Sequence, residues 1–173
     1  MADLQPAGFR FGAISANSVS FTEATGTNPE RVTYGEFAQA SLDAGGKYVA
    51  LTVGPGENED YITNPTVAFT RFMEYLGGDG TTEGGARRVA EGFTQPFTDQ
   101  FDQILIELGN EVWGGDAHDS PIGSNYILGY LPWVQQVTDL ITSSAYYDPN
   151  RMQVVISARS PRFSAFQNTI FNA

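Results

Sequence analysis

Between residues 104 and 114 the chain reads Ile104-Leu105-Ile106-Glu107-Leu108-Gly109-Asn110-Glu111-Val112-Trp113-Gly114. It begins as a short, mainly apolar run, which predicts a buried strand. It continues with glycines, a tryptophan and the polar pair Asn110-Glu111. Parallel (β/α)8 barrels carry their catalytic groups in loops at the carboxyl ends of the strands. The segment therefore predicts a strand that delivers the carboxylate of Glu111 to such a loop, where it can serve in acid/base catalysis.

The segments on either side alternate between strand and helix patterns. Apolar runs predict strands over residues 9–15, 48–53, 104–108 and 152–157, and helical spacing predicts helices over residues 33–44, 64–78 and 125–143. This alternation predicts an α/β fold in which helices connect parallel strands. We expect residues 1–173 to form a single domain, either part of a (β/α)8 TIM barrel or an open three-layer fold. Four strands are too few to close an eight-stranded barrel.

Local signals define several helix boundaries. Thr33 and Glu36 have the spacing of a capping box, and Asn64-Pro65 is a typical helix start. Residues 79–85, rich in glycine and threonine, predict a polar loop. Residues 86–101 fit neither periodic pattern, because Pro96 interrupts them. The apolar stripe of the second predicted helix is expected to face the core; it comprises Val67, Phe69, Phe72, Met73 and Leu76.

The amino-acid composition argues against several classes of function. The formal net charge is -11 and Lys47 is the only lysine, a poor composition for binding nucleic acid or an anionic membrane. A neutral carbohydrate substrate is compatible with this charge. The sequence has no cysteine, which excludes disulfides and a thiol nucleophile, and it has no apolar run of about 18 residues. No signal peptide is visible, and both a secreted and a cytoplasmic location stay open.

The two glutamates of the central segment have different expected roles. Glu107 lies inside the predicted strand, where its carboxylate faces either a barrel interior or a helix layer and needs a partner. Glu111 lies at the strand exit, where neighbouring apolar groups such as Trp113 raise a carboxyl pKa and suit it to acid/base work. Asn110 can bond a sugar hydroxyl. The alternative is that Asn110-Glu111 only caps the following turn.

Nearby residues offer weaker candidates. Trp113 can be a platform on which a sugar stacks, or a core residue. His118 can touch substrate, although a single loop histidine is more often solvated. Asp116, His118 and Asp119 have side chains that can ligate a metal, but there is no second ligand cluster in the sequence, so we expect neither a metal nor another cofactor.

The string Gly109-Asn110-Glu111-Val112-Trp113-Gly114 resembles the signature at the end of the fourth strand in clan A glycoside hydrolases. The longer string from Ile106 looks most like the family 51 α-L-arabinofuranosidases. Residues 30–160 are similar to the region from the second to the fifth strand of those retaining barrel enzymes. The resemblance implies Glu111 as the acid/base. Asn110, Trp113 and His118 are substrate-binding candidates from their own chemistry and their nearness to the motif.

The chain departs from the family pattern in two places. The family's second strand ends in arginine, an aromatic residue and Pro-Gly-Gly, and this chain has Phe9-Arg10-Phe11-Gly12, which retains only the first part. Arg10 is therefore a substrate-binding candidate with incomplete support. The family's nucleophile is a second glutamate after the seventh strand, and no residue here matches it. We expect the rest of the barrel, or a partner chain, to supply it.

Two other functions compete with a glycosidase. A non-catalytic carbohydrate-binding or structural module derived from such a barrel has the same strand and helix pattern without turnover. An open α/β hydrolase of another type is less compatible, because the sequence lacks a Gly-x-Ser-x-Gly elbow.

The isolated 173-residue chain should not turn over glycosides. Double displacement needs two carboxyl groups about 5–5.5 Å apart, and only Glu111 has a matching position in this sequence. Incubation with aryl glycosides, with release of the phenol followed by absorbance, measures this. Sustained turnover by the isolated chain, above that of a Glu111→Gln control, contradicts the expectation and means that another residue acts as the nucleophile.

Overall fold

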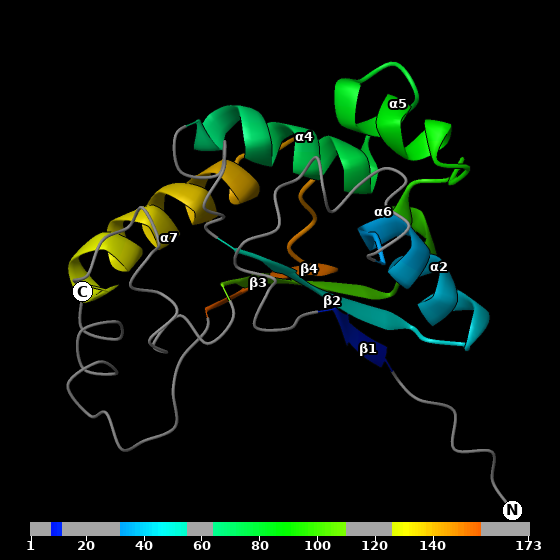
Figure 1. Cartoon of the computed structure of the whole chain (residues 1–173), viewed down its shortest axis with the longest axis horizontal. Helices are drawn as coiled ribbons and strands as arrows, with labels where there is room; N and C mark the ends of the chain where they lie inside the picture. Colours follow the sequence, from blue (N-terminus) through cyan, green and yellow to red (C-terminus); the bar gives the residue numbers. More distant parts are fainter. Residues whose placement is uncertain (1–7, 12–31, 55–63, 110–125, 157–173) are drawn as a thin grey trace, which may run out of the picture.

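The computed structural model describes residues 8–11, 32–54, 64–109 and 126–156 (Figure 1). The strands are β1 (Gly8–Phe11), β2 (Tyr48–Val53), β3 (Gln103–Leu108) and β4 (Met152–Ile156). The helices are α2 (Tyr34–Asp43), α4 (Pro65–Gly77), α5 (Glu83–Ala90), α6 (Phe97–Gln100) and α7 (Tyr126–Thr142). The predicted alternation of strands and helices is confirmed over these residues.

The described strands form one parallel sheet in the order β1-β2-β3-β4. Each strand therefore pairs with its neighbour in sequence, and every crossover moves in the same direction across the sheet. Parallel crossovers are almost always right-handed, so a constant direction places the connecting helices on one face. Figure 1 shows this arrangement, with α2, α4 and α7 on the same side of the sheet. A doubly wound fold, in contrast, has helices on both faces.

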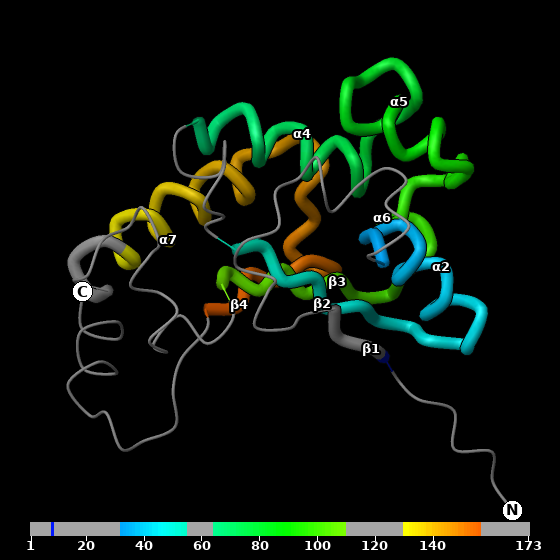
Figure 2. Tube along the Cα trace, viewed as in Figure 1, coloured from blue at the N-terminus to red at the C-terminus, as the bar shows by residue number. Residues whose placement is uncertain are grey.

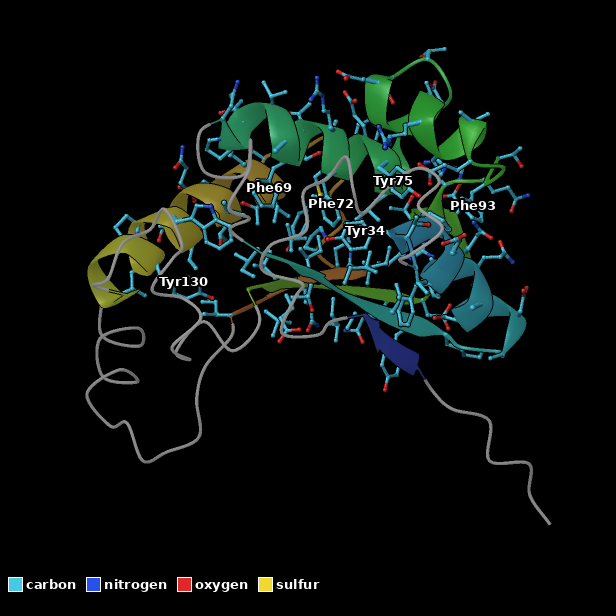
Figure 3. All side chains as sticks on the ribbon, in the orientation of Figure 1. Tyr34, Phe69, Phe72, Tyr75, Phe93 and Tyr130 are labelled. Carbon is cyan, nitrogen blue, oxygen red and sulfur yellow. The ribbon has the colours of Figure 1, made fainter. Side chains whose placement is uncertain are left out.

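The core lies between the sheet and these helices. Alternate strand residues point toward the helices and are buried, as period-2 geometry requires; they include Val49, Leu51, Val53, Ile104, Ile106, Leu108 and Met152. Rings from α2, α4 and α7 pack against them, and Figure 3 shows Tyr34, Phe69 and Phe72 between helix and sheet. The rings of Phe69 and Trp133 meet edge-on with centroids 6.3 Å apart, which joins α4 to α7.

The opposite face of the sheet is less enclosed along β3 and β4, although Ala50 and Thr52 of β2 are buried there. Along β3 the burial alternates, and Leu105 and Glu107 on this face are half-buried. On β4, Gln153 is exposed and Val155 is 36% exposed. Within the described ranges, no helix packs on this side of the sheet (Figure 2). An α/β fold with a parallel sheet is thus present, and its helices lie on one side.

Two predicted helix starts differ in their chemistry. The capping box at α2 is confirmed, because the Glu36 amide donates to Thr33 Oγ1 at 3.2 Å and the Thr33 amide donates to Glu36 Oε2 at 2.9 Å. Asn64 occupies the N-cap position of α4, but its side chain makes no capping hydrogen bond. The predicted apolar stripe of α4 was wrong in one position: Val67 is 36% exposed, because it lies on the outer side of the helix.

The predicted loop over residues 79–85 was also wrong in part, because α5 begins at Glu83. Thr82 caps this helix by accepting a hydrogen bond from the Gly85 amide at 3.2 Å. Gly84 allows α5 to approach α4 closely, since a Cβ at this position would lie 2.1 Å from the Arg71 carbonyl oxygen. Glycine has poor helix propensity, and here tertiary packing overrides it.

A buried arginine holds the corner between α4 and α5. Arg88 is fully buried and donates to three main-chain carbonyls: Tyr75 at 2.7 Å, Gly78 at 2.8 Å and Phe93 at 3.1 Å. Burial lowers the pKa of Arg88 from its ordinary value, although arginine stays protonated in proteins. The guanidinium thereby satisfies carbonyls at the end of α4 and after α5 that lack helical partners.

Replacing Arg88 by methionine should destabilise the fold by about 3–5 kcal/mol. The change keeps much of the apolar stem but leaves three carbonyls without their donor, and a buried unsatisfied group costs about 1–3 kcal/mol. Urea unfolding followed by circular dichroism measures the loss. The control is Lys47→Met, because the Lys47 side chain is 77% exposed and its ion pair with Asp102 is 3.9 Å long. That change should alter stability by no more than about 0.5 kcal/mol. Equal stability of the two variants contradicts the role given to Arg88.

Candidate functional site

The carboxyl ends of β2 and β3 lie side by side, because the register pairs Val53 with Leu108. Immediately after this pair the Gly109 amide donates to the Val53 carbonyl at 2.7 Å. Gly109 has φ of +75°, a left-handed conformation that residues with a side chain rarely adopt. The chain is therefore bent out of the strand direction at Gly109, directly before the motif residues Asn110 and Glu111.

Two tyrosines from the helix layer hold this edge of the sheet. Tyr34 of α2 donates its hydroxyl to the Thr52 carbonyl at 2.8 Å, and Tyr130 of α7 donates to the Leu108 carbonyl. Both side chains are buried. Burial raises the pKa of Tyr34 above its ordinary value, so its phenol remains a proton donor over the physiological range. The main chain leading into Gly109 is thus held from both helices.

Glu107 lies on the sheet face away from the helices, so its carboxylate does not face the helix layer. Its neighbour in the register is Thr52 of β2, and the Thr52 hydroxyl donates to Glu107 Oε2 at 2.8 Å. Thr52 is fully buried and Glu107 is half-buried. A carboxylate on this face therefore has the partner that its burial requires. It also lies two residues before the bend at Gly109.

Most of the predicted site residues fall outside the described part of the chain. Asn110, Glu111, Trp113 and His118 all belong to residues 110–125, for which no structure is described. Arg10 is a residue of β1, where its main chain pairs with Ala50. The structure therefore neither brings these side chains together nor separates them. It describes the strand ends from which the motif leaves the sheet.

The residues that hold the strand ends in place were not among the candidates predicted from the sequence. Thr52, Tyr34 and Tyr130 act through bonds to residues that are 18 to 55 positions away in sequence. One signal was present: Thr52 is the single hydroxyl within the apolar run Val49–Val53. A buried hydroxyl in a strand needs a hydrogen-bond partner, but the sequence alone does not predict which residue that partner is.

Neither a cluster of possible metal ligands nor a membrane-spanning helix occurs within residues 8–11, 32–54, 64–109 and 126–156. No group of three or more His, Asp or Glu side chains within those ranges could hold a metal ion. Asp116, His118 and Asp119 lie outside them. Across the same ranges, none of the helices combines the length and apolarity needed to cross a bilayer.

Comparison with known proteins assigns no family. No protein-family model, no curated protein and no solved structure matches the chain. The chemistry of this edge therefore rests on its geometry and on the motif over Gly109–Gly114.

Replacing Thr52 by valine should destabilise the protein by about 1–3 kcal/mol. Valine has nearly the same shape but no donor, so the half-buried carboxylate of Glu107 loses its bond to Thr52. Chemical unfolding at pH 7 measures this change. Thr52→Ser is the matched control, because it keeps the hydroxyl and should recover most of the hydrogen-bond contribution. A serine variant as unstable as the valine variant would mean that packing of the methyl group, and not the bond to Glu107, matters at this position.

Proposed function

We propose that this chain is part of a retaining glycoside hydrolase barrel in which Glu111 is the general acid/base. The observation that carries the proposal is the bend at Gly109. It ends β3, lies at the carboxyl edge of a parallel sheet and directly precedes Asn110-Glu111. Catalytic groups of parallel barrels occur at this edge. The proposed substrates are plant-type polysaccharides or oligosaccharides, arabinofuranosides in particular.

The sheet topology supports a barrel over an open three-layer fold. A sequential strand order with helices on one side leaves the second face available to become a barrel interior. Residues of that face on β2 and β3 are in register, with Ala50 beside Leu105 and Thr52 beside Glu107. Barrel interiors are built from such side-chain layers. The four described strands amount to half of an eight-stranded barrel, and we propose that the remaining strands come from further polypeptide or from a partner chain.

The proposed reaction is a double displacement. A second carboxylate, outside the 173 residues, attacks the anomeric carbon and forms a glycosyl ester, while the bond to the leaving oxygen breaks and Glu111 transfers its proton to that oxygen. Water then attacks the same carbon, the ester bond breaks, and the Glu111 carboxylate accepts the proton of the water. Asn110, beside the acid/base, is proposed to bind a sugar hydroxyl. No cofactor enters the cycle.

Glu111→Gln in the native-length protein should separate the two halves of this cycle. Hydrolysis of a substrate with a poor leaving group should fall by about 10²–10⁴-fold, because the glutamine cannot protonate the leaving oxygen. A dinitrophenyl glycoside needs no such proton and should still form the glycosyl ester, seen as a burst of dinitrophenol. Azide, a nucleophile that needs no general base, should then accelerate release of the glycosyl group. Stopped-flow absorbance with product analysis measures both steps.

The control is Glu83→Gln, at the start of α5, whose side chain is 67% exposed. Its kinetics should equal those of the unchanged protein. Equal loss of activity on both classes of leaving group, without azide rescue, contradicts an acid/base role for Glu111. A native-length protein that binds the oligosaccharide but never cleaves it supports the non-catalytic carbohydrate-binding module instead.

A further inference from the structure

A pocket lies at the end of the sheet opposite Gly109, near the amino ends of β3 and β4. Its volume is about 270 Å³. The polar and aromatic side chains around it come from α6 and from the segment between α7 and β4: Thr98, Asp99, Tyr146, Tyr147, Asp148 and Arg151. Ile104 and Met152, the first helix-facing residues of their strands, also line it. Pockets for drug-sized ligands start at about 300 Å³, so this one has room for a single ring.

The position separates this pocket from the proposed catalytic edge. A strand rises about 3.3 Å per residue, so Ile104 and Leu108 at the two ends of β3 are roughly 13 Å apart. One sugar residue cannot occupy both places. The pocket is therefore not a part of the site built around Gly109.

Several polar groups at this pocket have donors or acceptors that no described residue uses. Arg151 uses one guanidinium nitrogen to donate to the Phe101 carbonyl, and its other donors bond to no group in the described part of the chain. Asp148 Oδ1 accepts from the main-chain and side-chain nitrogens of Asn150 at 2.9 and 3.0 Å. In the same part of the structure the hydroxyls of Tyr146 and Tyr147 form no hydrogen bond. Donors and acceptors are thus both available to a ligand.

The side chains that line this pocket carry charges of both signs, unlike a site dedicated to an anion or to a cation. Asp99 and Asp148 repel an anion, and Arg151 repels a cation. Hydroxyl groups, in contrast, donate to a carboxylate and accept from a guanidinium or a phenol. Tyrosine rings add an apolar surface beside a polar tip, which fits a ring with C–H groups on one face and hydroxyls at its rim.

We propose that this pocket binds a single neutral sugar residue, at a site distinct from the catalytic edge. Its identification as a residue of the same polysaccharide substrate rests on the proposed glycosidase function; binding of a neutral sugar does not. A polysaccharide held here is retained on the protein while a different part of the chain is cleaved, which raises its local concentration at the catalytic edge.

Gly77 provides a way to perturb the pocket. A Cβ at Gly77 would lie 2.9 Å from Tyr146 Cβ and 3.2 Å from Thr98 Cγ2, so Gly77→Ala forces a shift among groups that line the pocket. Gly80→Ala is the matched control, because its Cβ would meet only Val89 Cγ2, at 3.6 Å, and Gly80 does not line the pocket. Asp99→Asn is a second variant: Asp99 is exposed, so the change removes a charge-assisted acceptor with little effect on packing.

The experiment is a titration of the ¹⁵N-labelled full chain with L-arabinose and D-xylose, followed by amide chemical shifts. Shifts should cluster at Tyr146, Tyr147 and Arg151, with a dissociation constant on the order of millimolar. Gly77→Ala should weaken binding at least about tenfold, and Asp99→Asn about fivefold or more, while Gly80→Ala leaves it unchanged. Thermal unfolding of each variant establishes that the fold is retained. Choline and inorganic sulfate, added separately, test a cation and an anion.

Three results overturn the proposal: no shifts at these residues up to 50 mM sugar (roughly ten times the expected constant), sugar binding that Gly77→Ala leaves intact, or saturable binding of choline or sulfate without binding of sugar. The same titration on Glu111→Gln separates the two proposals. If a native-length protein binds sugar at the pocket but hydrolyses nothing, the sugar-binding proposal stands and the glycosidase proposal is wrong. If it hydrolyses glycosides but binds no sugar at the pocket, the glycosidase proposal stands and the sugar-binding proposal is wrong.

Discussion

The pairing of β2 with β3 is the contact on which the described structure depends. Six consecutive residue pairs, from Tyr48–Gln103 to Val53–Leu108, hold the two central strands in parallel register. This register places Val49, Leu51 and Val53 on the same face of the sheet as the buried apolar residues of β3. The aromatic side chains of α4 pack against this apolar face. A shift by one residue would turn each of these side chains to the opposite face of the sheet. The same register sets Thr52 beside Glu107 and ends both strands together, at the edge where the motif begins.

Much of the fold could be predicted from local patterns. The strands over residues 48–53 and 104–108, the capped start of α2 and the long helix α7 all have signals within a few residues of each other. The start of α5 does not, because Glu83-Gly84-Gly85 has the composition of a loop and becomes helical only where close contact with Arg71 on α4 requires the absence of a Cβ. Arg88 is similar, since nothing in the sequence distinguishes a buried arginine from a solvated one.

The candidate site likewise contains some residues that the sequence identifies and others that it does not. The sequence motif identifies Asn110-Glu111 and the position of Gly109, and the left-handed φ of Gly109 explains why a glycine stands there. The groups that hold this edge, Tyr34, Tyr130 and Thr52, are joined to it by bonds across 18 to 55 residues of sequence. Such bonds follow from the assembled topology and leave no local pattern. The proposed acid/base role of Glu111 rests on the motif and on its position after the end of β3.

The two tyrosine bonds at the carboxyl edge have a consequence for how this protein can vary. Tyr34 and Tyr130 donate to main-chain carbonyls, so their contacts are indifferent to which side chain occupies positions 52 and 108. The backbone scaffold of the edge is thereby uncoupled from the residues that it displays. In the proposed enzyme, substitutions at positions that follow β2 and β3 in the sequence can then change the substrate specificity without removing these two bonds. Under the proposed function, this edge is a suitable place for directed evolution of specificity, whereas the helix layer that contributes the tyrosines is a poor one.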